Sequence, residues 1–299
     1  MDVDSRLDQA ASLARPRTVE PLPGGLTNLN FRVTTPQGRY VARLSGSAGE
    51  MLTIDRDAEH ANSRAAAAAG VAPQVTEYVP AARLLVIEWI EGRTLDAADL
   101  DDEVMLGRIA DTCRQLHAGP AFRGVFDMFD VQQRYLDIVR RNGFRLPAGY
   151  LELAPQVEQI RRALAVRAVA PVPCHNDLLP ANMIDDGQRI RLIDYEYSGM
   201  GDACFELGNI WSEASLPPER LTELVTAYHG RHSRSLIARA RLLGLIGKYG
   251  WTLWAAIQDG SSPLDFDFWS WGMEKYDRAV AEFAGPELAT WLDDVQALD

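Results

Sequence analysis

Lysine is almost absent from this chain of 299 residues: only Lys248 and Lys275 occur, and arginine supplies the other basic side chains. Acidic residues outnumber basic ones, 42 to 30, which gives a formal net charge of −12. Nucleic acids and anionic membrane surfaces are bound through basic patches, so neither is an expected partner. A cationic ligand is compatible with the acidic charge.

Cysteine and long apolar runs are scarce as well. Cys113, Cys174 and Cys204 form an odd set without a CxxC pair, so the sequence predicts neither a disulfide framework nor a zinc site. No apolar run approaches the roughly 20 residues that a membrane-spanning helix requires, and the polar segment 1–6 lacks the apolar stretch of a signal peptide. We therefore expect a cytoplasmic protein without membrane insertion.

The first ninety residues carry strand and turn signals around one helix. The segment 36–38, Pro-Gln-Gly, separates two apolar runs and predicts a hairpin. Gly70 follows an alanine-rich stretch and is a favourable residue just past a helix end. The predicted helix covers 55–69, and the predicted strands cover 18–22, 30–35, 39–44 and 84–89.

After Gly92 the apolar periodicity becomes helical. We predict an α+β fold of two lobes, a small β-rich nucleotide-binding lobe over residues 1–90 and a large, mostly helical lobe over residues 91–299. A cleft between the lobes is the natural place for a site. In the second lobe we predict helices at 102–117, 130–142, 154–168 and over most of the chain from 204, with short strands at 171–174, 183–184 and 190–193.

One loop carries two residues suited to phosphoryl transfer. The segment HNDLLPAN, residues 175–182, lies between a short strand and a hairpin, with Asp177 and Asn182 five positions apart. Phosphoryl transfer needs a carboxylate that accepts the proton of the attacking hydroxyl, and an oxygen ligand for Mg²⁺ nearby. Asp177 suits the first role and Asn182 the second. The alternative interpretation is an ordinary Asx-rich turn.

Asp194 strengthens the phosphoryl-transfer interpretation. It follows the apolar strand 190–193, seventeen positions after Asp177. A carboxylate at the end of a buried strand is costly unless it is paired, and a Mg²⁺ ion that bridges nucleotide phosphates prefers such oxygens. Glu196 points to the same side in an extended segment, so it is a candidate ligand for a second metal ion.

Two further groups of residues are candidates for nucleotide binding. Gly24 and Gly25 lie between two strands, where glycines let backbone N–H groups approach phosphate, and Thr27 and Asn28 could add donors. A plain glycine turn explains the same residues equally well. The sequence has no G-x-G-x-x-G or Walker A pattern.

The cation that clamps the phosphates is expected to be an arginine. A lysine on the third strand is usual in kinases, but here Arg43 stands at that place. Arginine can pair with phosphate and with a carboxylate, and Glu59 in the following helix is the candidate carboxylate that orients it. The alternative is that both are ordinary surface charges.

Together these residues resemble the choline/ethanolamine kinase branch of the aminoglycoside phosphotransferase-like kinases. The resemblance covers nearly the whole chain and is most specific in HNDLLPAN and in IDYEYSG, residues 193–199. It implies a protein-kinase-like fold with ATP and Mg²⁺ between the lobes, with Asp177 as base and Asn182 and Asp194 as metal ligands. An arginine at the place of Arg43 is usual in this branch. Glu88-Trp89-Ile90 matches the hinge, whose backbone binds adenine.

The branch is indicated by the C-terminal half. The segment 201–209 resembles the family's RGFDxGN motif, with Ala203-Cys204 in place of the basic residue and glycine. The resemblance implies that Glu213 faces the amine of the acceptor and that the segment 251–254, WTLW, corresponds to WGLW. The family has an aromatic residue shortly after this glutamate, whereas this chain has 216–218, Leu-Pro-Pro.

The two tryptophans of WTLW suit a cationic substrate on physical grounds. Trp251 and Trp254 are three positions apart on a predicted helix, so both indoles lie on one face. With the carboxylate of Glu213 they could hold a quaternary ammonium, each ring contributing about 0.5–2 kcal/mol through cation–π attraction. The alternative is that the pair builds core, which is what aromatic residues on helices usually do.

We therefore predict an ATP- and Mg²⁺-dependent kinase whose partner is a small amine-bearing alcohol, choline first and ethanolamine second. An aminoglycoside or thiamine kinase of the same fold is the alternative enzyme. A non-catalytic nucleotide or amine binder is the alternative of a different class, although it would be expected to lack Asp177, Asn182 or Asp194. The sequence leaves a homodimer open.

Overall fold

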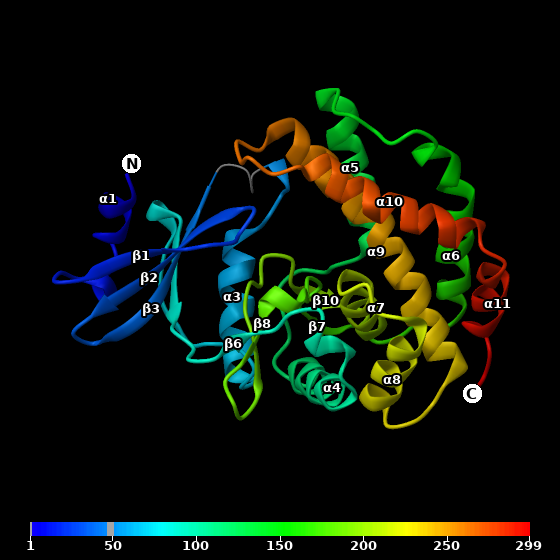
Figure 1. Ribbon diagram of the computed structural model, residues 1–299, viewed down its shortest axis with the longest axis horizontal. Coiled ribbons are helices and arrows are strands. Elements are labelled where there is room, and N and C mark those ends of the chain that lie inside the picture. The colour runs from blue at the N-terminus through cyan, green and yellow to red at the C-terminus, as the bar shows by residue number, and fades with distance from the viewer. Residues whose placement is uncertain (1, 47–50) are drawn as a thin grey trace.

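The protein, described by a computed structural model, has a β-sheet at one end and a larger body of helices at the other (Figure 1). The structure describes residues 2–46 and 51–299. Its strands are β1 (Thr18–Leu22), β2 (Asn28–Thr35), β3 (Gly38–Ser45), β4 (Val75–Val79), β5 (Leu84–Glu88), β6 (Arg93–Thr94), β7 (Val172–Cys174), β8 (Met183–Asp185), β9 (Ile190–Leu192) and β10 (Gly199–Gly201). Its α-helices are α1 (Val3–Leu7), α3 (Arg56–Ala68), α4 (Glu103–His117), α5 (Met128–Asn142), α6 (Ala154–Val166), α7 (Ala203–Glu213), α8 (Pro218–His229), α9 (Arg234–Ser261), α10 (Phe268–Ala284) and α11 (Glu287–Asp294).

A five-stranded antiparallel sheet in the order β1-β2-β3-β5-β4 forms the small lobe. The hairpin predicted at 36–38 joins β2 to β3, and the four predicted strands of this lobe agree with β1, β2, β3 and β5 within two residues. The edge strand β4 was not predicted. Its sequence VTEYV is rich in the strand-forming residues Val, Thr and Tyr, but it is short and lacks an apolar-polar alternation.

Two hydrophobic cores divide the chain, and α3 belongs to the larger one. The small core joins the sheet to the N-terminal segment through Leu7, Leu13, Leu44 and Leu84. The alanines of α3 instead pack in the core of the helical lobe. The predicted boundary after residue 90 lies between β5 and β6, and β6 already pairs with β8 of the helical lobe. The helix that carries Glu59 is therefore anchored to the lobe across the cleft.

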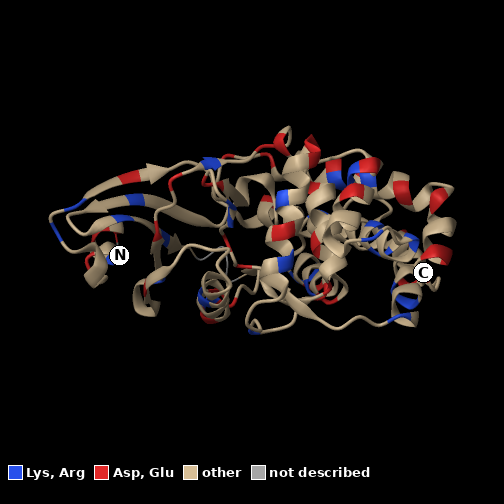
Figure 2. Ribbon diagram, turned by 90° about the horizontal axis from the view of Figure 1, so that it is seen from below, with Lys and Arg blue, Asp and Glu red and all other residues tan. Residues whose placement is uncertain are grey.

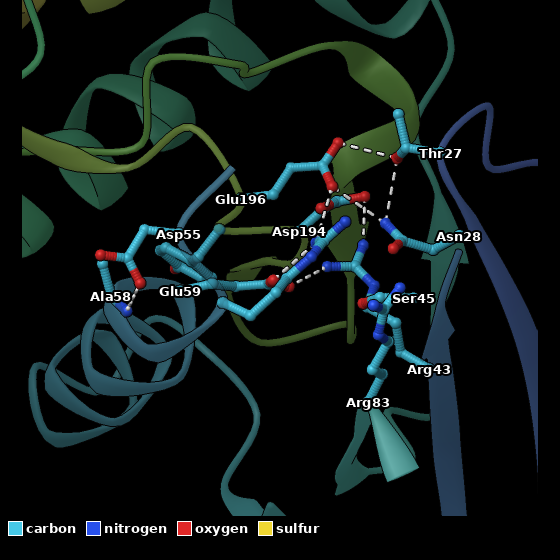
Figure 3. Close-up of polar contacts among 12 residues, drawn as sticks. Thr27, Asn28, Arg43, Ser45, Asp55, Ala58, Glu59, Arg83, Asp194 and Glu196 are labelled. Carbon is cyan, nitrogen blue, oxygen red and sulfur yellow. Dashed lines mark hydrogen bonds and ion pairs between the residues drawn. The ribbon is translucent and has the colours of Figure 1, made fainter. Parts of the chain in front are cut away.

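Several helices begin at an aspartate whose side chain accepts from backbone N–H groups of the first turn. Asp55 accepts from Asp57 and Ala58 and begins α3 (Figure 3), and Asp102 accepts from Met105 and begins α4. An N-terminal cap of this kind stabilises a helix by about 1 kcal/mol. These caps explain why the predicted helix starts at 55 and 102 agree with the structure.

The long helix α9 runs through the helical lobe and packs against α5, α7, α10 and α11 (Figure 1). It crosses α7 at a pair of glycines, where a Cβ on Gly208 would lie 2.1 Å from the backbone oxygen of Ala240. No larger residue fits at this crossing without moving a helix. The contact therefore holds the C-terminal half of α7 close to the tryptophans of α9.

Acidic and basic residues are interspersed along both lobes (Figure 2). Many of them pair with one another, as Arg108 does with Asp185 at 2.7 Å and Arg145 with Asp259 at 2.7 Å. Within the residues that the structure describes, no helix combines the length and apolarity needed to cross a membrane.

Lys248 is a buried charge in this lobe, and its protonation should make stability depend on pH. Its Nζ is 3.3 Å from Glu282 and 3.2 Å from Ser212 Oγ, and burial lowers its pKa to about 8. Between about pH 8 and the ordinary lysine value of 10.5, the unfolded chain binds more protons than the folded one, so the free energy of unfolding rises with pH. Relative to Lys248→Met, wild type should gain about 3 kcal/mol over this interval. Urea unfolding of both proteins at the two ends of the interval measures this gain, and parallel pH profiles would contradict it.

Candidate active site

Glu206 of α7 holds the loop HNDLLPAN by its backbone. The two carboxylate oxygens accept hydrogen bonds from the N–H groups of His175 (2.9 Å) and Asn176 (2.6 Å). Glu206 is completely buried, and His117 Nε2 lies 3.3 Å from its Oε1. Glu206 was not predicted from the sequence as a site residue. A carboxylate within the otherwise uncharged stretch 203–212 of α7 was the signal that could have found it.

Hydrogen bonds within the loop bring its two predicted site residues together. Asn182 Nδ2 donates to the backbone oxygen of Asp177 at 2.8 Å, which leaves Asn182 Oδ1 for other partners. The N–H of Ile193 donates to the backbone oxygen of Asn182 at 3.0 Å, and His175 Nε2 lies 2.8 Å from the backbone oxygen of Ile193. Because Asp194 follows Ile193 directly, these hydrogen bonds link the segments that carry all three predicted catalytic residues.

Two residues of this region have left-handed backbone conformations. Asn176 has φ 68° and Asp194 has φ 75°. Such conformations cost about 1–3 kcal/mol and persist at functional sites, where the surrounding contacts enforce them. The backbone N–H of Asn176 donates to Glu206, and its Nδ2 donates to the backbone oxygen of Tyr197 at 3.0 Å. The loop geometry is therefore imposed by the helical lobe.

Arg43 of β3 joins the small lobe to this centre (Figure 3). Its Nη1 is 2.6 Å from Glu59 Oε1 on α3, which is the ion pair that the sequence predicted, and its Nη2 pairs with Asp194 Oδ2. Burial acts to lower the pKa of Arg43. The negative charges of Asp194 and Glu59 outweigh burial, so the pKa lies above the ordinary arginine value. The guanidinium thus stays charged between two carboxylates.

Glu196 receives three donors from the small lobe and α3 (Figure 3). Thr27 Oγ1 donates to its Oε1 at 2.8 Å, while Asn28 Nδ2 (2.9 Å) and Arg56 Nη1 (3.1 Å) reach its Oε2. The predicted phosphate donors Thr27 and Asn28 therefore contact the predicted metal ligand Glu196. In this arrangement both oxygens of Glu196 are in use. Arg56 was not predicted, and its place in the sequence offers no signal beyond its neighbour Glu59.

The carboxylates of the centre have strongly shifted pKa values. Burial, followed by the charges of Asp194 and Glu196, raises the pKa of Asp177 well above its ordinary range. Burial and then Asp194 raise the pKa of Glu196 to about 7. Burial acts to raise the pKa of Asp194, but its contact with Arg43 outweighs this and lowers it. Carboxylates this close require cations, and a site of this kind is typical of catalytic centres.

The donor set around Asp194 fits a Mg²⁺ ion. Asp194 Oδ1 is buried and has no hydrogen-bond partner among the described residues, while its Oδ2 is taken by Arg43. The amide oxygen of Asn182 lies in the same region and is also a hard ligand. These two residues, rather than Glu196 with its three donors, have oxygens free for a metal ion.

The turn between β1 and β2 contains two glycines in left-handed backbone conformations, and their predicted contact with phosphate stays a prediction. Gly24 and Gly25 have φ 87° and 94°, and a Cβ on Gly25 would lie 2.9 Å from the backbone oxygen of Asn28. Gln258 Nε2 of α9 donates to the backbone oxygen of Leu26 at 3.3 Å. The turn is thereby linked to the helix that carries Trp251 and Trp254.

The predicted hinge lies at the end of β5. The N–H of Glu88 donates to Gln74 O at 2.9 Å, and the N–H of Trp89 donates to Arg39 O at 3.1 Å. Ile90 follows outside the strand and is half-buried. The chain leaves the sheet here and enters the helical lobe. Adenine binding by the backbone of Glu88 and Ile90 stays a prediction.

A cavity of about 300 Å³ lies between α3, α5 and the segments 123–126 and 196–198. Its lining includes Glu59, Tyr135, Glu196 and Tyr197. Small-molecule sites begin at about this size. The cavity thus adjoins the carboxylates on the side of α5.

Trp251 and Trp254 both contact Tyr197. Trp254 Nε1 donates to the Tyr197 hydroxyl at 2.8 Å, and the Trp251 ring packs edge-on to Tyr197 at 5.2 Å between centroids. Trp251 Nε1 donates to Asn209 Oδ1 at 3.1 Å. Both indoles are buried, Trp251 against Phe126 and Trp254 against Trp271, which agrees with the alternative of a core role. Their contact with a cationic substrate stays a prediction.

Glu213, the predicted partner of the acceptor amine, already has a cationic partner. Lys275 Nζ of α10 is 2.5 Å from Glu213 Oε2. The lysine also lies over the ring of Trp271, 4.1 Å from its centroid. Trp271 and Lys275 were not predicted as site residues, although their spacing of four places them on one face of a helix.

Three comparisons relate this chain to known proteins. The model of the phosphotransferase enzyme family matches residues 18–243. A choline/ethanolamine kinase family protein from Mesorhizobium loti is 30% identical, with 98% of each chain covered and a TM-score of 0.85.

More distant relatives extend the same pattern. Choline kinase LicA from Streptococcus pneumoniae is 26% identical over 94% of this chain and 98% of its own, with a TM-score of 0.79. A structure of LicA in complex with AMP has a TM-score of 0.77 with this chain. Mouse ethanolamine kinase 1 is 25% identical over 87% of this chain and 82% of its own length.

Proposed function

This chain belongs to the phosphotransferase enzyme family, in its choline/ethanolamine kinase branch, and on that premise we propose that it transfers the γ-phosphoryl group of ATP to the hydroxyl of a small amino alcohol. It is a small-molecule kinase with an alcohol group as acceptor. The two-lobed, protein-kinase-like architecture agrees with this activity. ATP as donor is supported by the AMP complex of LicA.

The proposed reaction uses Asp177 as general base. Its carboxylate accepts the proton of the acceptor hydroxyl while the oxygen forms a bond to the γ-phosphorus. The bond between that phosphorus and the β–γ bridging oxygen breaks, and ADP leaves with the electron pair. The raised pKa of Asp177 strengthens it as a base. Arg43, held by Glu59, supplies positive charge on the side of the phosphates.

Asn182 and Asp194 are the residues that would hold Mg²⁺. When bound, the ion supplies positive charge against the phosphates and the surrounding carboxylates. The glycine turn contributes the side-chain donors Thr27 and Asn28, which the nucleotide phosphates could take over from Glu196. Glu88 and Ile90 would bind adenine through their backbone.

The observation that carries this proposal is that hydrogen bonds link the segments of Asp177, Asn182 and Asp194, and that Arg43 of the small lobe pairs with Asp194. Its test is coupled ADP formation with purified protein, ATP and a panel of choline, ethanolamine, an aminoglycoside and thiamine. We expect ADP release with an amino alcohol that disappears when EDTA removes Mg²⁺. ADP release with the aminoglycoside or thiamine alone, or with none of the panel, would overturn the proposed acceptor class.

A further inference from the structure

Lys275 occupies the place that the sequence assigned to the cation of the acceptor. Its ammonium contacts Glu213 Oε2 at 2.5 Å and covers the face of Trp271 at 4.1 Å from the ring centroid. The side chains of Lys275 and Glu213 are only 8% and 5% exposed. A carboxylate and an indole face are the two features that attract an ammonium group, and here both already serve a lysine of the chain itself.

The ion pair lies beside the predicted acceptor site. On α7, Asn209 lies one turn before Glu213 and accepts a hydrogen bond from Trp251. On α10, Trp271 lies one turn before the lysine, and its ring centroid is 5.4 Å from that of Trp254. The ion pair therefore lies one turn along α7 and α10 from the residues that contact Trp251 and Trp254.

The ion pair is also within electrostatic reach of the proposed base. Burial and then the charges of Asp194 and Glu196 are the first causes of the raised pKa of Asp177. Glu213 raises this pKa further, and Lys275 lowers it. A charge that binds at this pair would thus act on the pKa of the residue that receives the proton of the hydroxyl.

One oxygen of Glu213 accepts no hydrogen bond from the residues that the structure describes. Glu213 Oε1 is buried and has no hydrogen-bond partner in the part of the chain that the structure describes. A buried acceptor without a donor costs about 1–3 kcal/mol, so a ligand that supplies an N–H donor regains that free energy. A protonated amine carries such a donor, whereas a quaternary ammonium carries none.

We propose that Lys275 is a specificity-determining residue, which directs the acceptor site to amines that keep at least one N–H and against quaternary ammonium groups. The pair of Glu213 and Lys275 has no net charge, so it offers little attraction to a cation that cannot donate a hydrogen bond. This inference rests on the proposed function and narrows it. It also reverses the order in which the sequence favoured choline over ethanolamine, because the sequence showed Glu213 without its lysine.

The first test needs no mutation. Ethanolamine, N-methylethanolamine, N,N-dimethylethanolamine and choline form a series in which each added methyl removes one N–H, and the protonated dimethyl compound still has one. With wild-type protein and saturating MgATP, we expect kcat/KM to fall by roughly tenfold or more at the last step, from the dimethyl compound to choline, as for loss of a charge-assisted hydrogen bond. A choline value equal to that of the dimethyl compound, or a uniform fall along the series, would overturn the inference.

The second test is Lys275→Met, with Lys248→Met as its matched control. Lys275→Met frees the Trp271 face and both oxygens of Glu213, so the ratio of kcat/KM for ethanolamine to that for choline should fall by roughly tenfold. Lys248, the only other lysine, is also buried but pairs with Glu282, and its replacement should leave this ratio unchanged. A structural defect would lower both acceptors together without moving the ratio.

The outcomes distinguish a wrong proposed function from a wrong role for Lys275. If wild-type protein releases ADP with none of the four alcohols, the proposed function is wrong, and this inference is wrong with it. If it phosphorylates them without a change at the last N–H, the proposed function stands and the role of Lys275 is wrong. Should Lys275→Met fail to fold, the methylation series alone decides the matter.

Discussion

Asp177→Asn is expected to lower kcat by roughly 10²–10⁴-fold, the range for loss of a positioned general base. The substitution should leave the loop in place, because the loop contacts of Asp177 are made by its backbone, whose oxygen accepts from Asn182 and whose N–H donates to His175. Only the proton acceptor is lost. Steady-state ADP release with the best acceptor of the panel measures kcat and KM.

The pH profile gives a second reading of the same variant. A base acts only after losing its proton, and burial raises the pKa of Asp177, so wild-type kcat/KM should increase with pH across the range where the carboxylate ionises. This increase should be absent from Asp177→Asn. The matched control is Asp137→Asn on the exposed face of α5, which should keep wild-type rates. If Asp177→Asn retained the wild-type kcat, the base would have to be another residue.

Arg43→Met is expected to cause the largest loss of stability together with a loss of activity. Removing one member of a buried ion pair leaves its partner as an uncompensated charge, at a cost of about 3–5 kcal/mol. We expect about 3 kcal/mol, the lower end of that range, because Arg56 still contacts Glu59 at 2.7 Å while Asp194 loses its arginine. Urea unfolding without nucleotide measures the change in the free energy of unfolding.

The catalytic effect of Arg43→Met should be separable from its effect on stability. Loss of one preorganised group that stabilises transition-state charge lowers kcat by roughly 10²–10³-fold, measured well below the unfolding temperature. Arg32→Met is the matched control, because Arg32 lies on the neighbouring strand β2 and its pair with Glu20 is exposed, which makes it worth about 0–1 kcal/mol. Equal losses in the two variants would show that the pairs around Arg43 have no special role.

The fold was largely predictable from the sequence because most of its signals are local. Glycines, prolines and capping aspartates lie at the ends of the elements they terminate or begin, so the predicted hairpin at 36–38 and the helix starts at 55 and 102 agree with the structure. The membership of α3 in the core of the helical lobe was not predictable, since a run of alanines has no preferred partner.

The residues of the candidate site that lie close together along the chain were also predictable from the sequence. The loop with Asp177 and Asn182, and Asp194 seventeen residues on, could be assigned because the chemistry depends on residue types at short spacing within one loop and hairpin. The pairing of Arg43 with Glu59 also spans only sixteen positions, from a strand to the helix after it. These are separations over which chain connectivity by itself limits the possible arrangements.

By itself, the sequence determined that this protein is a kinase of small molecules, through residues that lie close together along the chain. Tertiary structure decided how the charges of the site are paired. Arg56 of α3 reaches Glu196 across 140 positions. Lys275 reaches Glu213 across 62 positions, because α7 and α10 pack on the same helix α9. Whether a carboxylate is free for a metal ion or an amine depends on which side chains the packed helices bring to it. Among the described residues, no side chain or backbone group donates to Glu213 Oε1. This is why we expect the acceptor site to prefer an amine that carries an N–H donor.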